Sequence, residues 1–219
     1  QYANGLPDIK AAFHEAKKWL KLDTGNLSVR RFEPRPMADC APKNKDEEYK
    51  IVSYHPIDRE SRQADYLCET RGIDFSVLQR YGVGQEDYWW GEVNQKFATI
   101  IFPWMAQNAA GQWVQRGVKR LAVDRPTING KVRKLTRPQV NSEYHLVGMP
   151  AIGNDETMLV ICEGEIDALS VAQLGYPAVS VPQGAKADTP GRPPNAGNKW
   201  IEHDFDWLAR FQEIKILMD

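Results

Sequence analysis

Three carboxylates directly follow one short apolar run in this sequence. Residues 159–162 are Leu-Val-Ile-Cys, and Glu163, Glu165 and Asp167 come next within five positions. Clustered carboxylates repel one another unless a cation lies between them. Oxygen ligands without histidine or cysteine suit Mg²⁺ (or Mn²⁺) rather than zinc, and such ions support phosphoryl transfer. The spacing therefore indicates a metal site. The alternative is that these acidic side chains only complement the dipole of the helix that follows.

The pattern around these acids predicts how they are positioned. Apolar runs at 157–162, 177–181 and 213–219 alternate with a helical segment that ends at Gly175 and another at about 199–210. Strand and helix in alternation predict a parallel sheet with crossover helices. In such sheets functional groups gather beyond the carboxyl ends of the strands.

Two strand ends and one helical turn supply the predicted ligands. Glu163 ends the first of these strands and Asp219 ends the third. Asp167 lies in the first turn of the following helix, so it can point back to the same edge. Glu163, Asp167 and Asp219 are therefore the predicted metal ligands. Glu165 is expected to turn away from Glu163 as a bystander.

A basic segment precedes the acidic one. Residues 113–137 hold eight Lys or Arg and one Asp, although the whole chain has a net charge of −1. Alternation on a strand would place several of these cations on one face, ready to bind phosphates; a solvated hairpin face is the alternative. The candidate nucleotide- or nucleic-acid-binding residues here are Arg116, Lys119, Arg120, Lys131, Arg133 and Lys134.

Two further features could contact a nucleotide or a base. Gly184 and Lys186 follow the second strand of the parallel sheet. A glycine there lets the backbone approach a phosphate or metal, and Lys186 could neutralise charge; a loop without a ligand is the alternative. The tryptophans at 89, 90 and 113 could stack on unpaired bases, or they could simply pack in a core.

Upstream of residue 155 the pattern is mixed. Residues 7–21 have helical apolar spacing, 60–82 predict two short helices, and 96–105 and 112–123 predict strands joined by a turn. The Asn129-Gly130 pair predicts another turn, which could extend that sheet. The predicted organisation is an N-terminal helix and linker (1–59), an α+β subdomain (60–154) and an incomplete α/β domain (155–219).

Composition favours a cytoplasmic protein with no membrane partner. The 219 residues are 42% apolar and 26% charged, and no apolar run approaches the roughly 20 residues of a membrane span. Three distant cysteines indicate a reducing compartment. There is no Cys-x-x-Cys, and the histidines at 14, 55, 145 and 203 form no pair with ligand spacing. No zinc is therefore expected in this segment.

The motifs together resemble the TOPRIM domain of primases and topoisomerases. The stretch 159–186 and the strand 213–219 have the family's strand, Glu-Gly, helix, strand, glycine loop and acidic strand in order. The form "EGEIDALS" is similar to that of phage primase–helicases and their Twinkle-like relatives. A weaker resemblance covers "RGIDFSVLQRYGVG", "IIFPWM", "GVKRLAV" and "YHLVGM" upstream. The resemblance implies an α+β primase-like region followed by an α/β TOPRIM domain.

The same resemblance implies an activity. Such primases make short RNA primers on single-stranded DNA from ribonucleoside triphosphates with Mg²⁺, in the bacterial cytoplasm. Glu163 then assists metal binding or proton transfer, Asp167 and Asp219 hold metal, and Lys119 with Arg120 contacts the triphosphate or template. In longer relatives a helicase domain follows on the same polypeptide. Two alternatives are a non-catalytic single-stranded-DNA-binding module of a Twinkle-like helicase, and a TOPRIM nuclease or topoisomerase.

The sequence departs from the family pattern in two ways. The sequence stops at Asp219, before the second aspartate of the family's Asp-x-Asp motif, and it has no zinc module. It also lacks an initiator methionine. A fragment of a longer protein is therefore expected, and this fragment alone should be weak or inactive.

Overall fold

The computed structural model describes residues 51–184 and 199–217, which belong to one compact unit spanning 47–219. The helix predicted at 7–21, together with Lys186 and Asp219, lies outside the described residues. Within the described part of the chain no helix has the length and apolar character needed to cross a membrane.

A five-stranded sheet forms the larger layer, and its neighbouring strands are antiparallel. Its strands, in spatial order, are β1 (His55–Pro56), β2 (Gly84–Trp90), β3 (Gln95–Gln107), β4 (Trp113–Ala122) and β7 (Thr136–Pro138). The two predicted strands are confirmed as β3 and β4. They are joined by a tight turn in which the Asn108 side chain accepts hydrogen bonds from the backbone N–H groups of Ala110 and Gln112. The strands β1, β2 and β7 were not predicted.

The predicted Asn-Gly turn is also confirmed. Asn129 and Gly130 have φ values of 51° and 73°, as a tight hairpin turn requires. The turn joins β5 (Thr127–Ile128) to β6 (Lys131–Val132), which form a separate two-stranded sheet. The hairpin therefore does not extend the larger sheet.

Short helices cover one face of the larger sheet. They are α2 (Arg62–Asp65), the π-helical turn Tyr66–Thr70 and α3 (Phe75–Arg80). Ser61 begins the first of them, because its hydroxyl accepts a hydrogen bond from the Ala64 N–H. The two helices predicted within 60–82 are therefore present.

The predicted parallel sheet is confirmed. It contains β10 (Glu213–Leu217), β8 (Met158–Cys162) and β9 (Ala178–Ser180) in that order, and both pairings are parallel. Helix α4 (Glu165–Gln173) connects β8 to β9. A single turn of 3₁₀-helix (Met149–Ala151) precedes β8.

The helix predicted at about 199–210 is instead two single turns, α5 (Trp200–His203) and α6 (Phe205–Leu208). Asp204 interrupts them with a φ of −102° and a ψ of 8°. Its buried carboxylate accepts a hydrogen bond from the Leu146 N–H at 2.7 Å. That tertiary contact fixes the break, which helical spacing alone could not indicate.

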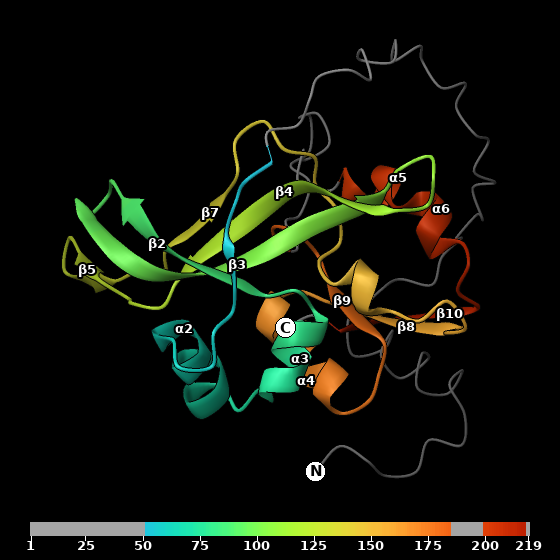
Figure 1. Ribbon diagram of the computed structural model, residues 1–219, viewed down its shortest axis with the longest axis horizontal. Coiled ribbons are helices and arrows are strands. Elements are labelled where there is room, and N and C mark those ends of the chain that lie inside the picture. The colour runs from blue at the N-terminus through green and yellow to red at the C-terminus, as the bar shows by residue number, and fades with distance from the viewer. Residues whose placement is uncertain (1–50, 185–198, 218–219) are drawn as a thin grey trace, which may run out of the picture. The chain divides into compact units, whose positions relative to one another are not determined.

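One residue joins the two sheets edge to edge. The Val147 N–H donates to the Ser180 carbonyl at 2.9 Å, the Ser180 N–H donates back at 3.2 Å, and Val147 also bridges to Trp104 of β3. On one face α3 and α4 lie side by side (Figure 1). Side chains from both regions, including Phe102 and Leu169, share one core cluster. The boundary at residue 155 stays a prediction.

Candidate active site

Strand β8 places Glu163 at the carboxyl edge of the parallel sheet. The strand is the central one, and its alternate residues enter two cores: Val160 and Cys162 one, Leu159 and Ile161 the other. Pairing with β10 continues past the strand, because the Glu163 N–H donates to the Leu217 carbonyl at 3.2 Å. Glu163 is half-buried, and this backbone hydrogen bond holds it beside the end of β10.

Asp167 folds back toward the end of the same strand. Helix α4 begins after Gly164, and a Cβ added to Gly164 would lie 2.5 Å from an Asp167 carboxylate oxygen. A larger residue at 164 would displace that carboxylate from this position. Burial and, to a smaller extent, the nearby Asp167 charge together raise the pKa of the Cys162 thiol to about 11. The orientation predicted for Asp167 is therefore the one observed.

Gly184 brings the loop after β9 to Glu163. Its φ is +71°, a left-handed conformation in which any other side chain is strained. A Cβ at this position would lie 3.5 Å from a Glu163 carboxylate oxygen. Glu163, Asp167 and the backbone of Gly184 therefore surround the end of β8, while Asp219 and Lys186 lie outside the described residues.

Glu165, which was not predicted as a metal ligand, pairs with a cation of the other sheet. Its carboxylate is buried at the start of α4 and lies 2.6 Å from the Lys119 ammonium group of β4. Both side chains are largely shielded from solvent, with 7% and 13% exposed. The pair ties the basic strand of one sheet to the acidic strand end of the other.

Lys119 and Arg120 were predicted to act as a pair, but they occupy opposite faces of β4. Neighbouring residues of a strand point to opposite sides. The Arg120 guanidinium lies 2.6 Å from a Glu86 carboxylate oxygen and stacks over the Tyr88 ring, 4.5 Å from its centre. The Lys119 side chain therefore faces Glu165 of α4, while the Arg120 side chain faces β2.

The other predicted cations lie elsewhere. Arg116 lies 3.8 Å from the Glu143 carboxylate. Lys131, Arg133 and Lys134 are exposed on or just after the β5–β6 hairpin. Figure 1 shows β5 at the end of the larger sheet that is remote from β8 and α4. The hairpin cations and Glu163 are therefore not brought together.

The three tryptophans predicted as stacking candidates differ in exposure. Trp90 is fully buried, and its indole N–H donates to the Thr99 hydroxyl at 3.2 Å. Trp113 packs against the core between the parallel sheet and α6. Of the three, Trp89 alone is half-exposed and open to a base.

A cluster that sequence reasoning missed lies beside Val147. Ligand atoms of Glu143, His145 and His203 converge within 4.8 Å of one another. Burial lowers the pKa of His145, but the Asp204 carboxylate, which accepts a hydrogen bond from its ring, and the nearby Glu143 carboxylate outweigh this and raise the pKa to about 9. The Glu-x-His spacing on an extended segment was a local signal. His203 comes from a distant part of the sequence, so its approach was not predictable from spacing.

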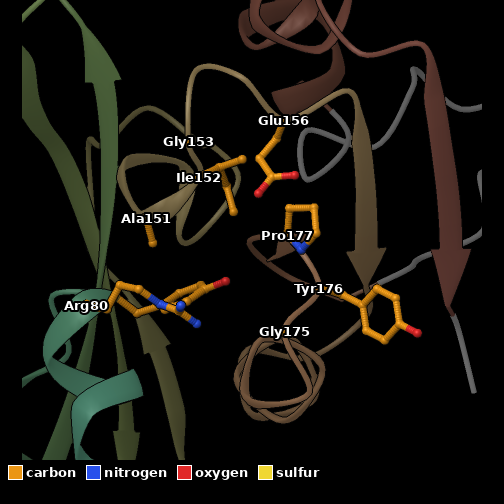
Figure 2. A pocket seen from close by; sticks show the side chains of 9 residues that line it. Arg80, Ala151, Ile152, Gly153, Glu156, Gly175, Tyr176 and Pro177 are labelled. Carbon is orange, nitrogen blue, oxygen red and sulfur yellow. The ribbon is translucent and has the colours of Figure 1, made fainter.

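A cavity of about 60 Å³ lies at the opposite edge of the parallel sheet. Arg80, Tyr176 and Glu156 are among the residues that line it (Figure 2). Its wall includes Pro177, which directly precedes β9, so it is at the amino edge. It is therefore distinct from the strand end that carries Glu163.

Comparison with protein-family models and with curated proteins finds no match for this sequence. Solved structures do resemble it. The primase domain of gp4 in a bacteriophage T7 DNA polymerase complex is 21% identical with a TM-score of 0.47, over 76% of this chain and 67% of that one.

Two structures of DnaG also resemble it. A catalytic core is 17% identical (TM-score 0.45; 71% of this chain), and a catalytic domain bound to single-stranded DNA is 16% identical (TM-score 0.47; 74% of this chain). The chain spans just over half of each, 54% and 56%. These structural neighbours are TOPRIM primases, the family that the motifs of this chain resemble.

Proposed function

We propose that this chain is the catalytic part of a primase, which joins nucleotides on a single-stranded DNA template by metal-dependent nucleotidyl transfer. The observation that carries the proposal is the contact between Lys119 and Glu165. It brings a phosphate-binding cation from the antiparallel sheet to the strand end where Glu163 and Asp167 lie. Cation and carboxylates at one edge are what a nucleoside triphosphate with its metal ions requires.

The donors at this edge fit a hard divalent cation. Glu163 and Asp167 offer carboxylate oxygens, and the bare backbone of Gly184 leaves space beside Glu163. These two carboxylates, with Asp219, would hold Mg²⁺ (or Mn²⁺). When bound, the ion would polarise the α-phosphate of the incoming nucleotide.

The side chains of the chain then have separate roles in the reaction. The primer 3′-hydroxyl forms a bond to the α-phosphorus, and the bond to pyrophosphate breaks. Glu163 accepts the proton that the hydroxyl loses. The Lys119 ammonium group has three N–H donors, and the one bonded to Glu165 leaves others for the triphosphate oxygens.

We propose that the cations outside the acidic edge contact the DNA. Lys131, Arg133 and Lys134 on the hairpin, with Arg116, bind the phosphates of the single-stranded template, and Gly184 and Lys186 approach the nucleotide. Binding through phosphates weakens steeply with salt. The choice of ribonucleotides, a phage or prophage primase–helicase as the parent, a helicase domain on the same polypeptide and a bacterial cytoplasmic location are parts of this proposal that follow from the family resemblance.

Primer synthesis tests the proposal. The native polypeptide is incubated with single-stranded DNA, Mg²⁺ and labelled ribonucleotides, and short RNA products are measured. Glu163→Gln should reduce product formation by roughly 10²- to 10⁴-fold, because it removes a metal ligand and proton acceptor. Glu156→Gln is the matched control, since Glu156 lies at the opposite edge of the sheet.

Two outcomes would count against the proposal. Equal synthesis by Glu163→Gln and the unmodified protein would remove Glu163 from the site. DNA binding by the unmodified protein without any primer would support the non-catalytic DNA-binding module instead.

A further inference from the structure

A second group of metal-ligating side chains lies apart from Glu163. Glu143 and His145 come from the extended segment before Val147, and His203 comes from the end of α5. A His145 ring nitrogen, Nε2, lies 3.3 Å from one Glu143 carboxylate oxygen, and His203 Nε2 lies 3.8 Å from the other. The ligand atoms of all three residues lie within 4.8 Å of one another.

Both imidazoles present the same nitrogen to this cluster. His203 Nδ1 lies 2.9 Å from the Tyr144 carbonyl oxygen, which can only accept, so this nitrogen carries the proton. His145 Nδ1 lies 2.6 Å from the Asp204 carboxylate and donates to it in the same way. When the rings are neutral, both Nε2 lone pairs therefore point toward Glu143. A second-shell oxygen on Nδ1 is how proteins orient histidine ligands of a metal.

One ring nitrogen of His145 lacks a hydrogen-bond partner among the described residues. The residue is 4% exposed, and its Nε2 atom is buried without a hydrogen bond of acceptable geometry among the described residues. The 3.3 Å separation from Glu143 is longer than a charge-assisted hydrogen bond of about 2.7–2.9 Å. Zinc bonds of about 2.0–2.1 Å place two ligands roughly 3.3 Å apart, so this separation fits zinc, while the 3.8 Å between His203 Nε2 and Glu143 must shorten when the ion binds.

We propose that Glu143, His145 and His203 form a zinc site, with Asp204 as the positioning residue for His145. Two histidines and one glutamate form a known zinc ligand set, in which water completes the tetrahedron. Imidazole nitrogen favours zinc over Mg²⁺, which prefers oxygen alone. The His203 side chain is 27% exposed, so the ion has access from solvent.

This site lies toward the same edge of the parallel sheet as Glu163, but it is displaced sideways from it. Val147 pairs antiparallel with Ser180 of β9, so His145 lies toward the carboxyl ends of the parallel strands. In the sheet order it is displaced from β8 by two strand spacings, or roughly 10 Å. The inference rests on these contacts and stands whether or not the chain makes primers.

Zinc at this position would link the segment of Glu143 and His145 to that of His203, which is distant in the sequence. The residues that contact one another are 59 positions apart, as in Tyr144 with His203 and in His145 with Asp204. The unfolded chain does not hold these ligands together, so an ion bound only by the folded state stabilises it. The ion would thereby secure α5 against the strand that joins the two sheets.

The competing interpretation is an ion-pair cluster without metal. A protonated His145 between the Asp204 and Glu143 carboxylates would balance their negative charges without a metal ion. The two interpretations differ in what the protein binds, so direct metal titration separates them.

The test uses the full chain after treatment with a chelator and dialysis. Zn²⁺ is titrated by calorimetry, and Co²⁺ is added separately as a spectroscopic probe. We expect one equivalent of Zn²⁺ that Mg²⁺ in excess does not displace, and visible absorption bands of four-coordinate Co²⁺. Glu143→Gln combined with His203→Ala should lose that equivalent, and Asp204→Asn should weaken it roughly 10- to 100-fold.

The control is His55→Ala, because His55 is an exposed histidine on β1, outside the cluster. It should bind Zn²⁺ as the unmodified chain does. His203→Ala alone replaces a partly exposed side chain and should leave the circular dichroism spectrum unchanged while it weakens Zn²⁺ binding. Failure of the unmodified chain to bind Zn²⁺, or equal binding by the double variant, would overturn the proposal.

Discussion

Lys119 and Arg120 are adjacent on β4, and their side chains enter different regions of the molecule. Lys119 crosses to Glu165 at the start of α4, so it contacts the region that carries the acidic strand end. Arg120 stays within its own sheet, against Glu86 and Tyr88 of β2. Strand alternation separates the two cations before any tertiary packing acts. Two cations that are adjacent in the sequence therefore do not lie on the same face of the strand.

A third cation completes the comparison. Arg137 of β7 is opposite Arg120 in the register and pairs with Glu92. The exposed fraction of the carboxylate partner rises from Glu165 (7%) through Glu86 (20%) to Glu92 (44%), and Arg137 (36%) is more exposed than Lys119 (13%) or Arg120 (10%). Because solvent screens exposed charges, the energetic weight of the pairs should fall in the same order.

The largest effect is expected at Lys119. Lys119→Met leaves the Glu165 charge buried without its partner, which should lower the free energy of unfolding by about 3–5 kcal/mol in urea denaturation. Lys119→Met combined with Glu165→Leu should recover most of that loss, since an apolar pair can replace a buried ion pair. If the proposed function is right, the double variant stays inactive in primer synthesis. A cost below about 1 kcal/mol for the single variant would contradict the burial of the pair.

Arg120 should have an intermediate effect. Arg120→Met removes the partner of Glu86 and the contact with Tyr88, and should cost about 1–3 kcal/mol in the same urea experiment. The partner Glu86 keeps more access to water than Glu165, so less charge is stranded. A double-mutant cycle with Glu86→Gln measures the coupling of the pair. A cost that exceeded that of Lys119→Met would reverse the order set by burial.

Arg137 should have the smallest effect. Arg137→Met should change the free energy of unfolding by about 0.2–1 kcal/mol, because the pair with Glu92 is exposed. Raising NaCl to about 1 M should remove most of that difference, since the screening length then falls to about 3 Å. The measurement is urea denaturation at low and high salt. An effect that did not respond to salt would assign the role of Arg137 to packing on Tyr88 and Trp90.

The part of the candidate site that could be predicted is local. Glu163, Gly164 and Asp167 lie within one strand-to-helix turn, so apolar length and helical spacing placed them correctly. The strands β3 and β4 are long, with apolar stretches, and they were predicted for the same reason. Strand β2 was not predicted, because it begins with the polar residues Gln85, Glu86 and Asp87, and its pairing with β1 and β3 makes this segment a strand.

The sequence by itself determined the strands and the connecting helix of the parallel sheet and which acid ends its central strand, because these depend on neighbours within a few residues. Only the tertiary structure decided that Lys119 reaches Glu165, that Asp204 breaks a helix, and that His203 meets His145. Each of these contacts joins segments far apart in the chain. Their geometry is set by the pairing of Val147 with two sheets and by a shared core. The physical reason is that local propensity fixes backbone conformation. Contacts between side chains that are distant in the sequence depend instead on how their backbone segments pack.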